Sequence, residues 1–541
     1  GEPNGLRTTR SKRAMVLMAS AAPCGTSAAA SGQAAVQELD VSPVSLGGLN
    51  LSSVFDCEGG YFEVTWSGSV EINDSIRIGR NTMVSISGDY IPSMYRFYPW
   101  GSVDPFNSAV ESSVVSSKNM TWPSNDVTAA SAVVGQGMIS PMFVVDGGLL
   151  NLDGIALRNG NTVMVNGNGT IRGGAIYAVN ANITVNECAF EDNYADRFGG
   201  AIYANTSSMV VKNTAFRRCR AGPVPDEEKE SDEVDGNGGA LSVEFTNVLL
   251  DNCLFHYCYA RKKGGALHEG VGNITIFNSD FYNNSAGGPN IEDQDSIGEG
   301  GDLSFSVCLA GYDGSNSVGR CGANDSTFAN SFVARKGGAV AVGEGEEDEV
   351  DSYTEFHRCR FWNAKTGIYI ADTPQGEGGA FSMGAGTTLI LADSVINASY
   401  AGKKGGAIVL SGGENYGDSP GGMLYLRNST FIDCSAGRET GGVVYMNEYA
   451  IANIEGDDNK FFNNEVSTSG AVLAATTGTI VNIYGGTFSD NIAGDDGGVF
   501  WAKGRLNIRG GRFINNIADG RGGVFNADEE GNITVTGGEF L

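Results

Sequence analysis

The chain has 541 residues, with 35 basic and 63 acidic side chains and a formal net charge of −28. This balance argues against a nucleic-acid-binding protein, because phosphate backbones are bound by basic patches or stripes. The 79 glycines follow no collagen period, so they indicate a turn-rich repeat structure.

The first part of the chain differs in composition from the rest. Residues 1–48 are rich in Ala and Ser, and a basic segment at 7–13 precedes a mildly apolar one at 14–22. This order is typical of a secretory leader, so we expect residues 1–48 to be signal-like or disordered. We expect residues 49–150 to form the first coils and cap of the fold. No run approaches the ~18 apolar residues that a membrane-spanning helix needs.

Residues 151–541 contain an internal repeat. A glycine doublet is followed by a small and an aliphatic residue, as in Gly173–Ile176, and a Phe-x-x-Asn unit answers it, as in Phe190–Asn193. The period is about 26 residues, which is the signature of a repeat architecture. The marker residues are the second glycines Gly174, Gly200, Gly265, Gly338, Gly406, Gly498 and Gly523, the phenylalanines Phe190, Phe255, Phe281, Phe488 and Phe513, and the asparagines Asn193, Asn284, Asn464, Asn491 and Asn516.

Within one repeat the hydrophobic period is two. Short runs such as 182–185, 273–276 and 532–535 alternate polar and β-branched residues, as half-buried strands do. Three short strands per repeat would make one coil of a parallel β-helix, an all-β solenoid. Stacked coils would place the phenylalanines in an inward ladder. The asparagines would bond to their neighbours and tolerate a left-handed backbone at the turn. We therefore expect structural rather than catalytic roles for all marker residues.

Some repeats are lengthened by insertions. These lie at 222–237, 287–298, 307–325, 364–376 and 411–421, and we expect them to be surface loops that project from the rod and are its most mobile part. Two acidic runs, 226–235 and 344–351, are interpreted as solvated turns that keep the protein soluble. A calcium site there is the alternative, although the repeated calcium-binding nonapeptide is absent; no other cofactor or metal is predicted.

A basic residue often precedes the doublet, as at Arg172, Lys263, Lys336, Lys404 and Arg521. In register these residues would form a discontinuous positive stripe that could meet anionic glycans. The alternative is a solvated turn position whose charges pair with the acidic loops.

The ten cysteines leave the redox state open. Cys308 and Cys321 fall in one insertion and could staple it. Cys219 and Cys258 lie in consecutive coils within disulfide range, although parallel side chains are not ideal. The alternative is that the cysteines of the repeat are small apolar core residues in a reduced protein. The twelve N-x-S/T sequons point to a secreted glycoprotein.

The pairing of GGA-[aliphatic] with FxxN resembles the repeat of the chlamydial polymorphic outer membrane proteins. The resemblance covers residues 173–541, although Cys219, Cys258 and Cys434 replace the asparagine. It implies a single right-handed parallel β-helix of the pectin-lyase-like class. It also implies an extracellular or cell-surface protein, in the bacterial case an adhesin. Similar repeats occur in large surface proteins of algae and other protists.

Three functions remain open at this point. A polysaccharide lyase or glycoside hydrolase of the same fold would need two carboxylates across the scissile bond. The pairs Asp457–Asp458 and Asp495–Asp496 fall in turns without a nearby histidine, and the three histidines are scattered. A structural wall or sheath component is the other alternative. Because the sequence shows no recognisable set of catalytic residues, we favour a non-catalytic, adhesin-like protein that binds glycans or other surface molecules. We do not expect it to bind nucleic acid.

The last repeat stops at Leu541, where the previous copy continues through Asn516 to Ala518. We therefore expect that the sequence is a fragment.

Overall fold

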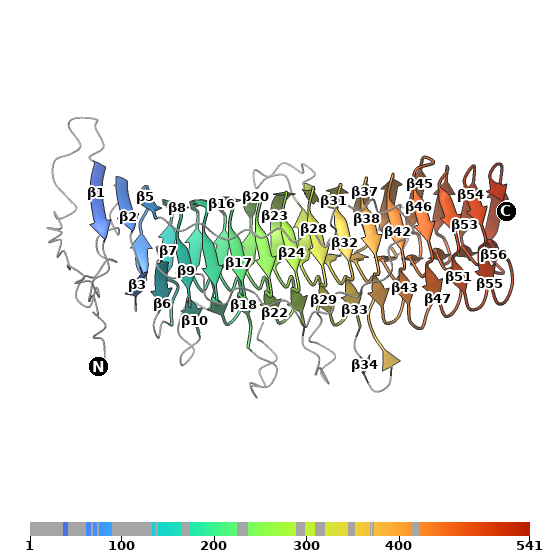
Figure 1. Ribbon diagram of the computed structural model, residues 1–541, viewed down its shortest axis with the longest axis horizontal. Helices are drawn as coiled ribbons and strands as arrows, with labels where there is room; N and C mark the ends of the chain where they lie inside the picture. The colour runs from blue at the N-terminus through green and yellow to red at the C-terminus, as the bar shows by residue number, and fades with distance from the viewer. Residues whose placement is uncertain are drawn as a thin grey trace, which may run out of the picture.

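The computed structural model describes residues 36–41, 61–66, 69–72, 75–88, 132–135, 139–163, 172–223, 236–287, 298–308, 320–343, 352–367, 369–370, 373–413 and 421–541. All described elements are strands, and none of these residues forms a helix that could cross a membrane. Figure 1 shows the strands stacked as successive coils along one axis, from the blue N-terminal strands to the red C-terminal ones.

Most described coils run through four strands, one more than the sequence predicts. After the glycine doublet comes β11 (Ile176–Val179), then β12 (Asn182–Asn186), the phenylalanine strand β13 (Ala189–Glu191) and the two-residue strand β14 (Tyr194–Ala195). The next coil starts at β15 (Ile202–Asn205), which pairs in parallel with β11. The fourth strand is too short to leave a periodic signal in the sequence.

The largest sheet has 29 strands among the described residues and consists of two arms, joined by the 11-residue strand β23. We call the strands after the glycine doublet the doublet arm, and those that follow the second arm. The doublet arm contains β4 (Ile76–Ile78), β7 (Phe143–Asp146), β11, β15, β19 (Leu241–Glu244), β23 (Leu267–Phe277), β26 (Leu303–Cys308), β30 (Val340–Val342), β36 (Phe381–Met383), β40 (Ile408–Leu410), β44 (Val444–Met446), β48 (Leu473–Ala475), β52 (Phe500–Ala502) and β56 (Phe525–Ala527). The second arm contains β1 (Val36–Val41), β2 (Tyr61–Trp66), β5 (Met83–Ser87), β8 (Leu149–Asp153), β12, β16 (Ser208–Lys212), β20 (Thr246–Asp251), β27 (Arg320–Asn324), β31 (Ser352–His357), β37 (Thr387–Ala392), β41 (Met423–Arg427), β45 (Ile451–Glu455), β49 (Ile480–Ile483), β53 (Arg505–Ile508) and β57 (Asn532–Val535).

Two further sheets close the coils. The phenylalanine sheet contains β3 (Ser69–Ile72), β6 (Ala132–Gly135), β9 (Ala156–Arg158), β13, β17 (Ala215–Arg217), β21 (Leu254–His256), β24 (Asp280–Tyr282), β28 (Thr327–Ala329), β32 (Arg360–Trp362), β38 (Val395–Asn397), β42 (Thr430–Ile432), β46 (Lys460–Phe462), β50 (Thr487–Ser489), β54 (Arg512–Ile514) and β58 (Glu539–Phe540). The short-strand sheet contains β10 (Asn161–Thr162), β14, β18 (Arg220–Ala221), β22 (Tyr259–Ala260), β25 (Ser285–Ala286), β29 (Phe332–Val333), β33 (Lys365–Thr366), β39 (Tyr400–Ala401), β43 (Ser435–Ala436), β47 (Glu465–Val466), β51 (Ile492–Ala493) and β55 (Ile517–Ala518).

Pairing between coils is parallel throughout these sheets. The described antiparallel pair, β34 (Tyr369–Ile370) with β35 (Thr373–Pro374), lies inside an insertion, and β34 projects from the rod in Figure 1. The predicted right-handed parallel β-helix is therefore confirmed. The sheet also starts earlier than predicted, because β1 lies within residues 1–48 and pairs in parallel with β2.

The core is organised as columns, meaning residues at the same position of successive coils. Phe255 and Phe281 are fully buried, and their ring centroids are 4.7 Å apart with planes 3° from parallel, so the rings stack at the coil spacing of a β-solenoid, about 4.8 Å. The phenylalanine column contains two stacked runs: Phe190, Phe216, Phe255, Phe281, Phe328 and Phe361, then Phe431, Phe461, Phe488, Phe513 and Phe540. Ile396 separates the two runs in register.

The two glycines of a doublet serve different needs. Gly173 has φ of +65°, in the left-handed region that side chains disfavour. Gly174 is required by space instead, because a Cβ there would lie 2.3 Å from the carbonyl oxygen of Gly200 in the next coil. The second glycines thus let successive turns approach closely. In the degenerate copy Ser469-Gly470-Ala471-Val472, alignment with the GGA motif would make Gly470 the second glycine. Its φ of +71° shows that it occupies the position of the first glycine instead.

The asparagine of FxxN bonds along the axis, but the left-handed residue is its neighbour. Asn193 is buried, accepts a hydrogen bond from the Gly160 amide at 2.8 Å and donates one to the Leu157 carbonyl at 3.1 Å. The residue before it, Asp192, has φ of +56°. The sequence prediction that the FxxN asparagine itself adopts the left-handed turn is therefore wrong by one residue. Its side chain is needed inside, where it caps backbone groups of the preceding coil.

Insertions leave the coil and return at nearly the same point. A Cβ built on Gly222 would lie 3.3 Å from the Cα of Gly236, and one on Gly287 would lie 3.0 Å from the Cα of Gly298. Paired glycines therefore lie where the chain leaves and re-enters the coil at these two insertions, and the coil continues in register beyond them. Most residues of the predicted loops, and both acidic runs with their suggested calcium site, lie outside the described residues.

Candidate functional site

The outer side of the doublet arm carries the most varied surface chemistry among the described columns. In each doublet strand the aliphatic residue, such as Ile176, points into the core and the next residue, Tyr177, points outward. We call the column of these outward residues the doublet face. In chain order it contains Tyr177, Tyr203, Ser242, His268, Ser304, Ala341, Ser382, Val409, Tyr445, Ala474 and Trp501.

The N-terminal end of the doublet face is an aromatic and charged cluster. Tyr177 and Tyr203 stack with centroids 5.6 Å apart. The Arg172 guanidinium lies over the Phe198 and Tyr203 rings at 5.0 and 4.8 Å, which is the geometry of a cation–π contact.

The Tyr203 hydroxyl links this cluster to the next coil. It accepts a hydrogen bond from Arg172 Nη1 at 2.7 Å and donates one to Glu244 Oε2 at 2.7 Å. Asn205 Nδ2 donates to the same carboxylate oxygen at 2.9 Å. Burial raises the pKa of Tyr203, so the phenol is a neutral hydrogen-bonding group here and not a base.

The C-terminal end of the face repeats the combination of aromatic rings and cations. Lys404 Nζ lies 4.4 Å from the Tyr445 ring centroid, and Lys503 Nζ lies 5.4 Å from that of Trp501. Burial, with the nearby Glu439 and Glu377 carboxylates, raises the pKa of Tyr445 to about 12. Tyr445 and Trp501 are half-buried, so each keeps accessible ring surface.

Between the aromatic ends the face is lined by small side chains and one histidine. The column passes through Ser242, His268, Ser304, Ala341 and Ser382 over five successive coils. All five side chains are buried, so this stretch presents little side-chain surface. The doublet face therefore has half-buried aromatic residues toward its ends, Tyr177, Tyr445 and Trp501, and a mostly polar, buried middle.

A column of alternating charge runs beside the middle of the face. The residues just before the doublets bridge in register in the order Arg172, Phe198, Asn237, Lys263, Glu299, Lys336, Glu377 and Lys404. Lys263 Nζ lies 3.2 Å from Glu299 Oε2, and Lys404 Nζ lies 3.3 Å from Glu377 Oε1.

Of the two alternatives for the basic residues before the doublets, the positive stripe is wrong for Lys263, Lys336 and Lys404. These lysines are in register, but Glu299 and Glu377 stand between them, and Lys263 and Lys404 form ion pairs with these acids. The acids that intervene are residues of the same column and could not be recognised from the basic copies alone. Arg521 lies outside this described run of bridges.

The candidate catalytic groups are not brought together. His268 lies on the doublet face, whereas His256 belongs to the phenylalanine sheet and His357 to the second arm. Burial and the charges of Arg217 and Arg218 lower the pKa of His256 to about 4, so its imidazole is neutral at physiological pH. His357 Nε2 lies 2.6 Å from Glu355 Oε1.

The aspartate pairs have structural contacts or lie free at the surface. Asp457 and Asp458 are exposed. Asp496 Oδ1 accepts a hydrogen bond from the Arg521 amide at 2.6 Å, and its Oδ2 accepts one from Asn526 at 3.0 Å. These contacts hold two neighbouring turns together, which matches a structural role better than a catalytic one.

Two acidic side chains that the sequence analysis did not single out lie inside the rod. Asp302 replaces the alanine of the doublet motif and is fully buried. It accepts hydrogen bonds from Asn284 Nδ2 at 2.9 Å and from the Ser331 hydroxyl, and burial raises its pKa to about 7. Glu269 is also fully buried, and burial raises its pKa well above the ordinary value. Strand alternation marks Glu269 as inward, and Asp302 stands where other doublets have a buried alanine, such as Ala266. An acid at either position was the available signal.

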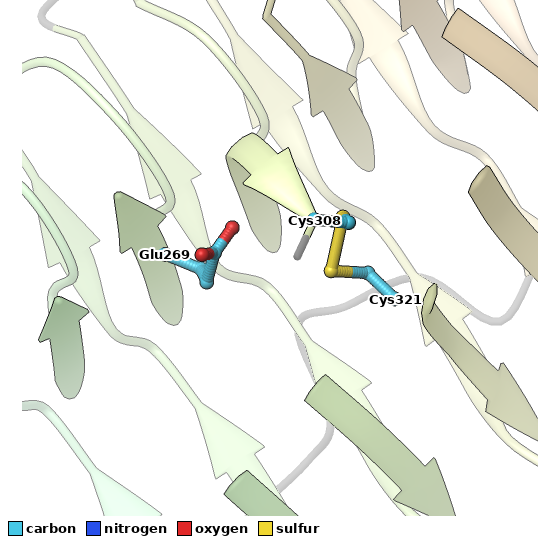
Figure 2. A group of neighbouring side chains, drawn as sticks. All are labelled: Glu269, Cys308 and Cys321. Carbon is cyan, nitrogen blue, oxygen red and sulfur yellow. A yellow bond between two sulfur atoms is a disulfide. The ribbon is translucent and has the colours of Figure 1, made fainter. Parts of the chain in front are cut away.

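Glu269 lies beside the disulfide that joins Cys308 and Cys321 (Figure 2). The Cα atoms of the two cysteines are 5.7 Å apart. A carboxyl oxygen of Glu269 and the two sulfur atoms all lie within 4.8 Å of one another. Carboxylate and thiolate are both metal ligands, so this buried group is a candidate cation site.

The expected pairing of Cys219 with Cys258 is absent, and both carry buried free thiols. Cys219 Sγ instead contacts the Phe190 carbonyl oxygen at 3.4 Å, and Cys258 Sγ contacts that of Phe216 at 3.7 Å. Each thiol thus points at the backbone of the preceding coil, as the FxxN asparagine does, and the neighbouring Cys258 thiol adds to the effect of burial in raising the pKa of Cys219. Burial raises the pKa of Cys188, Cys253, Cys359 and Cys434 to about 12.

Comparison with known proteins supports the fold. A family model described as a right-handed beta helix region matches residues 149–305. No match was found among curated proteins or among solved structures. The matched segment spans β8 to part of β26 and includes the N-terminal aromatic cluster and His268.

Proposed function

We propose that this protein is a non-catalytic, secreted or cell-surface β-helix protein that acts as an adhesin and binds glycans along the doublet face. The observation that carries the proposal is the composition of that face. Half-buried aromatic rings stand toward both ends, Tyr177 stacked on the fully buried Tyr203 and Tyr445 beside Lys404, and small, mostly polar, buried residues lie between them.

This arrangement suits an elongated polar ligand. A half-buried aromatic ring offers an apolar surface beside hydrogen-bonding groups, and sugar rings have matching apolar faces and hydroxyl edges. The coils repeat at about 4.8 Å, so equivalent groups recur along an extended surface. The alternating charges of the neighbouring column favour neutral or mixed-charge glycans over purely anionic ones.

Resemblance of the repeat to the chlamydial polymorphic outer membrane proteins supports a location at the cell surface. Fold alone does not determine function, so the proposal rests on the doublet face and not on the repeat. A structural wall or sheath component would use the same stacked coils but would not require an aromatic and cationic face.

A polysaccharide lyase or glycoside hydrolase is the competing proposal. Such an enzyme needs two carboxylates that reach the substrate from opposite sides of the bond. Asp302 and Glu269 lie inside the core, and Glu244 is engaged by Tyr203 and Asn205. These positions favour binding over cleavage.

A glycan array probed with the purified protein tests the proposal. We expect binding to a defined set of oligosaccharides and a loss of about tenfold or more in the Tyr177→Ala/Trp501→Ala variant, since exposed aromatic anchors dominate such contacts. Tyr257→Asn is the matched control, because Tyr257 is an exposed aromatic residue on a different face. Equal binding by both variants would overturn the assignment of the face, and shortening of a polysaccharide by the wild type would favour the enzyme.

A further inference from the structure

The buried carboxyl group of Glu269 has no structural explanation within the apolar core. In register, its column reads Ala204, Val243, Glu269, Phe305 and Val342. Neither carboxyl oxygen makes a hydrogen bond of ordinary geometry; the Ser306 backbone only weakly opposes the effect of burial on the pKa. Burying a polar group without a hydrogen bond costs on the order of 2–7 kcal/mol, so an apolar residue would serve the fold better.

A second polar group beside the disulfide is also without a partner. Thr354 is fully buried, and its hydroxyl makes no hydrogen bond. It pairs in register with Cys321, one coil farther along the axis. A carboxyl group and two sulfur atoms therefore lie together in an otherwise apolar interior, with Thr354 in register with Cys321 in the next coil.

We propose that Cys308, Cys321 and Glu269 form a buried site for one thiophilic divalent cation of the Zn²⁺ class, and that the disulfide is the metal-free, oxidised form of this site. Thiolates select soft and borderline cations, and two sulfur atoms with a carboxylate suit Zn²⁺. This inference is independent of glycan binding.

The geometry needs little rearrangement. Two sulfur atoms bound to Zn²⁺ at about 2.3 Å in a tetrahedron lie about 3.8 Å apart, and the potential ligand atoms already lie within 4.8 Å of one another. Two thiolates and a carboxylate around a divalent cation leave a net charge of −1, far less costly to bury than an isolated carboxylate beside two thiolates.

The two forms are linked by a balanced reaction. A dithiol reductant attacks one sulfur of the disulfide, the S–S bond breaks, and Cys308 and Cys321 become thiols while the reductant closes to its own disulfide. Two electrons and two protons pass to the protein. Binding of the cation then releases the thiol protons, because metal ligands bind deprotonated, and Glu269 binds as its carboxylate.

The test uses Co²⁺ and Zn²⁺ on the full chain, reduced under anaerobic conditions in subdenaturing urea and then returned to buffer. We expect one Co²⁺ per chain with a thiolate-to-cobalt absorption band, displacement by Zn²⁺, and no binding by the oxidised protein. Glu269→Gln should weaken Co²⁺ binding by about tenfold or more. Cys434→Ser, which removes a buried thiol elsewhere in the core, should bind as the wild type does.

The Cys308→Ser/Cys321→Ser variant separates loss of the site from loss of the fold, since circular dichroism reports whether the coils remain. Failure of the folded, reduced wild type to bind Co²⁺ would overturn the proposal. Equal affinity of this double variant, or of Glu269→Gln, would do the same, because the ligands would then lie elsewhere.

Discussion

Asp302 shows how a single departure from the repeat changes the chemistry of the core. It stands in the column position that Ala266 and Ala339 occupy in the neighbouring coils. Its carboxyl group is held by Asn284 and Ser331. The protein thus keeps an ionisable group inside the rod, linked to the asparagine column.

This position predicts a pH dependence of stability. Burial raises the pKa of Asp302 to about 7 in the folded protein, against about 3.9 in the unfolded chain. Between these values the folded state binds more protons, so the free energy of unfolding falls as the pH rises from about 4 to about 7, by at most about 1.4 kcal/mol per pH unit.

Asp302→Asn should remove this part of the slope, measured by urea unfolding at several pH values. Glu269 has a shift in the same direction, so a smaller slope should remain. An unchanged profile in Asp302→Asn would show that Asp302 does not titrate in this range.

Substitution of a second glycine should cause a steric clash between coils, and this clash can be measured apart from the effect of a positive φ. A Cβ on Gly265 would lie 2.1 Å from the Gly301 carbonyl oxygen in the next coil, so Gly265→Ala must push two coils apart. We expect a loss of more than about 3 kcal/mol in urea unfolding. Gly456→Ala is the control, because Gly456 has φ of +81° but nothing within 4 Å of its Cβ position, and it should cost only about 1–2 kcal/mol. Equal losses of unfolding free energy in the two variants would mean that the backbone freedom of glycine, and not a steric clash with the next coil, sets the cost of the substitution.

At the scale of single elements, the alternating column beside the doublet face links consecutive coils by charge. Glu377 lies 3.3 Å from Lys404 and 3.7 Å from Lys403. The Lys404 side chain is only 10% exposed, so its ammonium group depends on that carboxylate more than a surface lysine would.

Glu377→Gln should therefore destabilise the protein by about 1–3 kcal/mol, between the values for exposed and buried pairs. The Arg427–Glu455 pair is more exposed, and Glu455→Gln should cost less than about 1 kcal/mol. Thermal unfolding at two salt concentrations distinguishes them, because screening should erase mainly the exposed pair. A loss for Glu377→Gln no larger than that for Glu455→Gln would contradict the burial argument.

The elements also show which features of the fold could be predicted from the sequence. Where a column depends on the chemistry of its side chain, the same residue type recurs in the sequence: Phe255 stacks on Phe281, and Asn193 caps the coil before it. The column of left-handed residues just before the asparagines has no recurring residue type, since it contains Asp192, Arg218 and Tyr257. There the backbone conformation repeats while the exposed side chain varies, so a residue pattern cannot reveal it.

The candidate site was harder to predict for a similar reason. The doublet face is defined by register between coils, and its residues share no type: Tyr203 pairs with Ser242, and Ser242 pairs with His268. Glu269, Cys308 and Cys321 come from strands that meet only after the coils stack. Motif spacing within one repeat cannot bring such residues together.

At the scale of the whole molecule, the rod accepts an insertion where the chain leaves and re-enters the coil at residues that lie next to each other. Gly222 and Gly236 lie against each other, and Asn237 resumes the register of Phe198. The coil does not need the intervening residues to hold its two ends together.

Deletion of residues 224–235, with Pro223 joined to Gly236, should therefore leave the β-helix folded. We expect an unchanged circular dichroism spectrum and a melting temperature within a few degrees of the wild type, since lengthening or shortening a surface loop changes its closure entropy only slightly. Deletion of residues 202–213, which removes β15 and β16 from the coil itself, is the contrasting variant and should unfold the neighbouring coils. Collapse on removal of 224–235 would show that this insertion is part of the fold.

The most direct test of the proposed function is the affinity for a bound glycan as a function of oligosaccharide length. Eight coil steps separate the half-buried Tyr177 on β11 from Tyr445 on β44, a span of about 38 Å at about 4.8 Å per coil. We predict that the affinity measured by calorimetry rises with each added sugar until the chain spans this distance, and that no oligosaccharide is shortened. An affinity that reaches its limit at one or two sugars, or the appearance of cleaved products, would contradict an extended, non-catalytic binding face.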